Sequence, residues 1–442
     1  MMRSLSRQWA TLLQGQMVRN ASWLFVGQGL GVVLQALNFI VLARLLGSYE
    51  YGIFVGAFAF TSLVAQYSAL GMGAVFLRYV SGARHVFSIY WGNILLATTT
   101  FGTLLAITLY MLAPRLLNPQ SAALVVLLGF ANCLFAQLTL EIGRVFQAFE
   151  KMPATAILNL LTNLMRALAS IGLLVTIHHA SAWNWAVATT IVSSISSLLA
   201  ISAVTYYFGR PKFDFLLFSR RSLEGAGFAF ASSTTSAYND LDKTMLSHYG
   251  MNQQNGIYSI AYRVVDMATI PIFSIRDAAL PRLFQRGREG GIKATSELGQ
   301  RLLKRSLPIS LVLAIGMFLL APLVPLLAGK AFNESAVALR WLCWIPVFRS
   351  IHQMTGCALT GAGYQNQRTM AQLAATALNF GLNFWLIPIH GWHGAAWASL
   401  VTDGALGMMN YGLLKYLVAT KNTNHVFLAS EGKIEEEAKR KT

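Results

Sequence analysis

Two arginines lie deep inside long apolar runs, where charged side chains are rare. Arg166 and Arg349 each stand about 11 residues into a run, roughly 17 Å along a helix at ~1.5 Å per residue. Neither has an acidic residue three or four positions away. A guanidinium keeps its charge and can donate two parallel hydrogen bonds to a phosphate. Since a charge at this depth is costly unless it faces a cavity or a partner, we predict that both line an anion-binding cavity. An acid on a neighbouring helix is the alternative.

Three further arginines are candidates for contact with the same anion. Arg276 stands beside Asp277, and we expect adjacent side chains to point in different directions, which leaves Arg276 available. Arg263 precedes Asp266 by three residues, a spacing that also permits an ion pair along one helix face. Arg78 lies at the end of an apolar run, where an interaction with lipid headgroups is the alternative.

Carboxylates inside apolar runs are candidates for ion coupling. Asp240, Asp266 and Asp403 have such positions, and a buried carboxylate can take up and release a proton. Asp240 also stands three residues before Lys243, so an ion pair along the helix is the alternative there.

The remaining polar groups indicate neither metal nor cofactor. Glu141 and Arg144 have the three-residue spacing of an ion pair. The three cysteines lie singly in apolar runs, and no histidine pair has the spacing of zinc ligands. We therefore predict no catalytic residue, no metal site and no cofactor.

The apolar runs that hold these residues are typical of a membrane protein. Hydrophobic residues make up 55% of the 442 and charged residues 12%, against roughly 25% charged in a soluble domain. A helix needs about 20 apolar residues to cross the hydrocarbon layer. Twelve segments qualify: 20–43, 52–77, 87–113, 121–143, 154–177, 184–208, 225–247, 256–280, 306–328, 338–361, 369–389 and 394–418.

The positions of lysine and arginine predict the orientation. With the N-terminus in the cytoplasm and alternating spans, 25 of the 34 basic residues fall in cytoplasmic segments and four in external ones. We therefore expect both termini to be cytoplasmic. The net charge of +17 follows from these loops, so we predict contact with membrane lipids and no nucleic-acid partner.

The loops are short, and no segment is long enough for an enzyme domain, so we predict that the protein is not an enzyme. The sequence divides into an interfacial segment 1–19, a helical bundle 20–213, a second bundle 214–420 and a polar tail 421–442. A faint repeat relates the two bundles, because Gly52-Ile53-Phe54 and Gly256-Ile257-Tyr258 open corresponding spans. Parallel repeats of this kind occur in transporters.

Several short motifs occur in the order known from one family. They are Ala43-Arg44-Leu45-Leu46-Gly47 with Tyr51-Gly52-Ile53-Phe54, Leu70-Gly71-Met72-Gly73 with Arg78-Tyr79-Val80, Leu241-Asp242-Lys243 with Leu246, Gly256-Ile257-Tyr258-Ser259-Ile260-Ala261-Tyr262-Arg263, and Gly391-Trp392-His393-Gly394-Ala395-Ala396-Trp397-Ala398. Because these motifs occur in this order, the chain resembles the polysaccharide transporters of the multidrug/oligosaccharidyl-lipid/polysaccharide (MOP) exporter superfamily, which are the O-antigen and exopolysaccharide flippases.

The resemblance implies an all-α polytopic membrane protein of about twelve helices, in two six-helix bundles around a central cationic cavity. It implies alternating access and an undecaprenyl-diphosphate-linked oligosaccharide as the transported partner, in the bacterial inner membrane. A polysaccharide polymerase and a chain-length regulator are the implied protein partners. A cation-coupled multidrug antiporter of the same superfamily is the alternative, although its cationic substrates favour acidic and aromatic residues over arginines.

Overall fold

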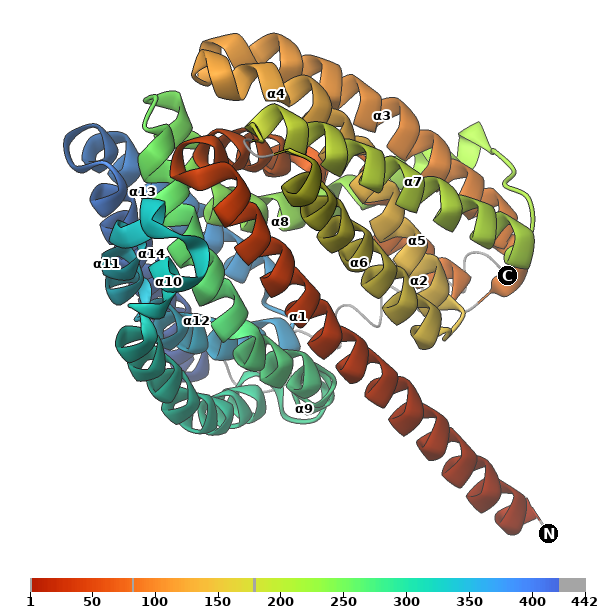
Figure 1. The fold of residues 1–442 in the computed structure, drawn as a ribbon. Helices are drawn as coiled ribbons and strands as arrows, with labels where there is room; N and C mark the ends of the chain where they lie inside the picture. Colours follow the sequence, from red (N-terminus) through yellow and green to blue (C-terminus); the bar gives the residue numbers. More distant parts are fainter. Residues whose placement is uncertain (1, 82, 178–179, 421–442) are drawn as a thin grey trace. The chain divides into compact units, whose positions relative to one another are not determined.

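The computed structural model describes residues 2–81, 83–177 and 180–420, and side chains from residue 29 onward except 231 and 235. The predicted tail 421–442 lies outside the described residues. Helices make up nearly all of the described chain, and no strand occurs in it (Figure 1). The chain forms two compact units, Met1–Gly256 and Ile257–Thr442.

The first unit begins with a long helix that is followed by shorter ones. Its elements are α1 (Met2–Ala65), α2 (Met72–Val80), the 3₁₀ turn η1 (Arg84–Val86), α3 (Phe87–Leu116), α4 (Pro119–Gly129), the π-helix η2 (Phe130–Ala136), α5 (Gln137–Ala148), α6 (Met152–Thr176), α7 (Ala182–Phe208) and α8 (Phe215–His248). The local sequence determines where several of these helices begin. Asn118 accepts a hydrogen bond from the Ser121 amide with Pro119 as the first helical residue, and Ser181 and Asn184 form a capping box.

The second unit contains most of α9 and the helices that follow it. These elements are α9 (Asn252–Leu320), α10 (Leu323–Ala328), the 3₁₀ turn η3 (Lys330–Phe332), α11 (Asn333–Leu342), α12 (Ile345–Gly361), α13 (Gln365–His390) and α14 (Trp392–Thr420). α14 packs extensively against both α12 and α13. The first residues of α9 belong to the first unit.

Glycines divide the two longest helices. Gly47 in α1 has φ 69° and Gly291 in α9 has φ 59°, conformations that residues with a Cβ rarely adopt.

The predicted spans fall on helices or on the helical turns that join them. Seven helices of the described chain are long and apolar enough to cross a membrane. The all-α membrane fold is thus confirmed, while the count of twelve and the domain boundaries remain predictions.

Each unit has its own apolar core, and the outer helix faces are also apolar. In the first unit Phe76, Trp91 and Ile142 are fully buried among α2, α3 and α5. In the second, Leu283 and Leu359 join α9 to α12. Large apolar side chains are exposed on the other faces, for example Met111 at 71% and Val175 at 74%. Extensive exposed apolar surface of this kind fits contact with lipid acyl chains.

Candidate functional site

An ion pair between two helices lies at the centre of the polar residues in the second unit. Arg349 of α12 is 4% exposed, and its Nη1 lies 2.9 Å from Oδ1 of Asp266 on α9. Its Nη2 donates a hydrogen bond of 2.8 Å to the hydroxyl of Tyr262, one turn earlier on α9. Arg349 therefore has an acid on a neighbouring helix, the alternative that its sequence left open. The Asp266 carboxylate is 42% exposed, so breaking this pair should cost less than the about 3–5 kcal/mol typical of a fully buried pair.

A second polar contact lies one turn further along α12. Nε2 of His352 lies 3.3 Å from Oδ1 of Asp403 on α14, and both side chains are buried. The backbone carbonyl of His352 accepts a hydrogen bond from Asn410, also on α14. Asp403, predicted as an ion-coupling residue, is thus held beside a histidine that the sequence analysis had not selected.

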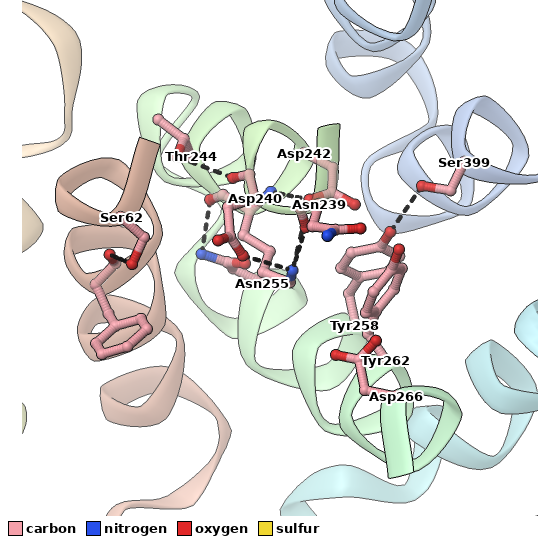
Figure 2. A network of polar contacts seen from close by, with 12 residues as sticks. Ser62, Asn239, Asp240, Asp242, Thr244, Asn255, Tyr258, Tyr262, Asp266 and Ser399 are labelled. Atoms are coloured by element: carbon pink, nitrogen blue, oxygen red, sulfur yellow. Dashed lines mark hydrogen bonds and ion pairs between the residues drawn. The ribbon is translucent and has the colours of Figure 1, made fainter. Parts of the chain in front are cut away.

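Tyrosines extend this polar face along α9. The Tyr258 hydroxyl lies 3.0 Å from Oγ of Ser399 on α14, and the rings of Tyr258 and Tyr262 have centroids 5.6 Å apart. Figure 2 shows Tyr258, Tyr262 and Asp266 following one another along the helix. Their spacing of four residues places them on one face, and this spacing is the signal by which sequence reasoning could have found the tyrosines.

In the first unit, charged and amide groups gather around Lys243 of α8. Its Nζ lies 3.0 Å from Oδ1 of Asp240, so the ion pair along the helix, the alternative given for Asp240, is formed. Oδ1 of Asp242 lies 4.0 Å from the same nitrogen. Asn255 of α9 donates hydrogen bonds to the backbone carbonyls of Lys243 and Gly52. Lys243 and Asp242 are both buried, so these contacts offset the cost of burying charge.

Arg78 also has a protein partner, Glu224 of α8, at 2.9 Å. Oε2 of Glu224 lies 3.2 Å from Nη1 of Arg221, and Arg221 donates a hydrogen bond to the Tyr79 hydroxyl. Burial lowers the pKa of the Arg221 guanidinium, but Tyr79, Tyr90 and Glu224 outweigh it, so this pKa lies above its usual value. Two arginines thus share one carboxylate at the ends of α2 and α8.

The structure corrects the expectation for Arg276. Its Nε lies 2.7 Å from Oδ1 of the adjacent Asp277, because the long side chain can bend back along the helix. Its Nη1 donates to the amide oxygen of Gln353 at 3.3 Å. Arg263 is exposed one turn before Asp266, and Arg166 is half-buried on α6. Of the predicted site residues, Arg349 and Asp266 are therefore in direct contact, and their roles remain predictions.

Long apolar helices, seven of them in the described residues long enough to cross a membrane, define a multi-pass membrane protein. Residues 17–286 match the family model described as polysaccharide biosynthesis protein. This match covers more than half of the sequence, so the chain belongs to the polysaccharide biosynthesis protein family. The resemblance inferred from the motifs is thus confirmed. No match was found among curated protein sequences.

Solved structures of the MOP superfamily share the fold at low sequence identity. The lipid II flippase MurJ in an inward closed conformation has TM-score 0.71 and 12% identity, over 90% of this chain and 87% of MurJ. An inward-facing multidrug resistance transporter of the MATE family has TM-score 0.66 and 16% identity, over 88% and 96%. A MOP superfamily transporter from Pyrococcus furiosus has TM-score 0.61 and 14% identity, over 91% and 96%.

Proposed function

We propose that the protein is a flippase that moves an undecaprenyl-diphosphate-linked oligosaccharide across the cytoplasmic membrane by alternating access. The repeat unit would then serve the synthesis of a surface polysaccharide, either O-antigen or exopolysaccharide. The observation that carries the proposal is that the chain belongs to the polysaccharide biosynthesis family and shares the fold of MOP transporters. The known members of that superfamily include a lipid II flippase.

The charges inside the helices support a phosphate-bearing substrate. Moving a diphosphate through hydrocarbon requires cations along the path, and arginine suits phosphate because it stays charged and binds in a fork. Under this proposal Arg166, Arg263 and Arg276 contact the diphosphate, together with Arg78 near the cytoplasmic ends of α2 and α8. Arg349 would join them once the substrate competes with Asp266.

The proposal is tested by deleting the gene and restoring it on a plasmid. We expect the deletion to remove or shorten the surface polysaccharide and to retain lipid-linked repeat units on the inner leaflet. The wild-type gene should restore both. A plasmid gene that carries Arg301→Ala is the control and should restore the polysaccharide as the wild-type gene does. Arg301 forms an exposed pair with Glu297, and such pairs contribute little to stability. Normal polysaccharide together with new drug sensitivity would contradict the proposal and favour the multidrug antiporter.

A further inference from the structure

A small cavity lies inside the first unit. Its volume is about 80 Å³, against roughly 30 Å³ for one water molecule in the liquid. The polar lining comes from two helices, α5 and α8, and the turn after α1: Gln66, Gln137, Glu141, Arg144 and Ser232. The rest of the lining is small or apolar, so these five side chains determine what the cavity can bind.

Glu141 of α5 is the buried acid of this cavity, with its side chain 2% exposed. Its Oε1 accepts a hydrogen bond of 2.6 Å from Nη1 of Arg144. Its Oε2 is also buried and has no hydrogen-bond partner among the described residues. A methyl group at Gly73 of α2 would lie 1.5 Å from Oε2, so that oxygen occupies space that only a glycine leaves. Half of this carboxylate is therefore buried against α2 without a donor.

Arg144 differs from Glu141 in that its side chain is 25% exposed. A guanidinium has five N–H donors, so Arg144 can bind a second anion from its exposed side. It is the charged side chain beside Glu141 in the cavity lining, since α8 contributes Phe228, Ala229 and Ser232. From α2 the lining residue is Ala74, and from the turn before it Gln66 and Gly71. The nearest charges on α2 and α8, Arg78 and Glu224, pair with each other.

An anion that draws Arg144 away would leave Glu141 as an isolated carboxylate in an apolar setting. Such a group takes a proton in preference to remaining charged, because burying an unpaired charge costs far more than burying a neutral acid. Once protonated, the carboxyl group carries an O–H donor, and Gln66, Gln137 and Ser232 in the same cavity lining carry amide and hydroxyl oxygens of the kind that accepts such a hydrogen bond. The proton taken up by Glu141 thus offsets one of the negative charges that the incoming anion brings.

We propose that this cavity is an exchange site in which a phosphate group on Arg144 and a proton on Glu141 are taken up together. The phosphate oxygen replaces the carboxylate as the partner of Arg144, and hydronium supplies the proton for one new O–H bond. The proposal deepens the proposed function and rests on it, because the flippase substrate supplies the phosphate. It assigns to Glu141 the coupling of that substrate to protons.

The test is a binding measurement with the full chain in nanodiscs. Undecaprenyl diphosphate is titrated by calorimetry in buffers of different ionisation enthalpy, between pH 7.5 and 8.5. We expect the wild type to take up about one proton per bound lipid. Its affinity for the lipid should therefore fall by up to about tenfold for each unit by which the pH rises. Inorganic pyrophosphate is titrated in parallel. Equal proton uptake with pyrophosphate would identify the free anion, and not the lipid headgroup, as sufficient for exchange.

Two variants and one control separate the possible outcomes. Glu141→Gln should bind the lipid without proton uptake, and Arg144→Ala should lose binding at least tenfold. Glu297→Gln, at the exposed pair with Arg301, should behave as the wild type. Equal proton uptake in wild type and Glu141→Gln would overturn the proposal, as would proton-independent binding by the wild type. Proton-linked binding without any lipid flipping in liposomes would instead contradict the proposed function and leave the exchange site intact.

Discussion

Gly52 of α1 and Gly256 of α9 lie backbone against backbone. A Cβ on Gly52 would come 1.7 Å from the carbonyl oxygen of Asn252 and 2.8 Å from the nitrogen of Gly256. A Cβ on Gly256 would come 2.0 Å from the carbonyl oxygen of Ser48. These two glycines open the corresponding spans of the sequence repeat, so the repeated positions contact each other directly. Small residues allow such close helix packing in membranes.

Gly52→Ala should therefore destabilise the first unit. The added methyl meets backbone atoms that cannot move aside, and overpacking of this kind costs about 1–3 kcal/mol or more. We expect a lower midpoint of thermal unfolding in detergent. The control is Gly172→Ala on α6, where the new Cβ would meet nothing within 4 Å. A midpoint for Gly52→Ala equal to that of the control would contradict the close packing of α1 and α9.

Arg349→Ala should reduce the amount of folded protein before it reduces transport per folded molecule. The substitution leaves Asp266 without its 2.9 Å partner, and because that carboxylate is 42% exposed, we expect a cost below the about 3–5 kcal/mol typical of a fully buried pair. We expect Asp266→Asn in the Arg349→Ala background to recover part of the stability, because it removes the unpaired charge. The measurement is folded protein by size-exclusion chromatography and transport normalised to it. No recovery in the double variant would show that the ion pair does not account for the loss.

Arg166→Ala should abolish transport per folded molecule, whereas Arg166→Lys should retain part of it. Lysine keeps the positive charge and loses the guanidinium fork, so an intermediate activity fits phosphate recognition. The same normalised assay applies, with Arg301→Ala as the exposed control. Unchanged specific transport in Arg166→Ala would remove this residue from the substrate path, although the flippase proposal could survive that result.

Reporter fusions after Gly209 and after Lys421 should both indicate a cytoplasmic position. The reason is the distribution of lysine and arginine, which strongly favours the cytoplasmic side for the segments that contain them. A compartment-sensitive pair, alkaline phosphatase and green fluorescent protein, provides the measurement. A periplasmic signal after Lys421 would mean that the number of spans in the second half is odd.

The sequence predicted the helices well because apolar length is a local property. Residues 154–177 and 184–208, for example, correspond within a few residues to α6 and α7. The site was less predictable, since Asp266 and Arg349 are 83 positions apart and only the packing of α9 against α12 joins them. Arg276 was misjudged because neighbouring Cβ atoms diverge while long side chains can still meet. Glu224 stands just before a predicted span, while His352 and the tyrosines lie inside predicted spans but were not selected as site residues.

The contact between Gly52 and Gly256 also constrains biogenesis. The ribosome must add about 200 residues after Gly52 before its partner exists, and the first unit includes the start of α9. Translation proceeds at roughly 5–20 residues per second, so α1 must wait at least about 10 seconds in the membrane for this neighbour. The first unit therefore finishes folding only after α9 has begun to insert, and a chaperone or insertase that shields α1 during that interval would bind the face carrying Gly52.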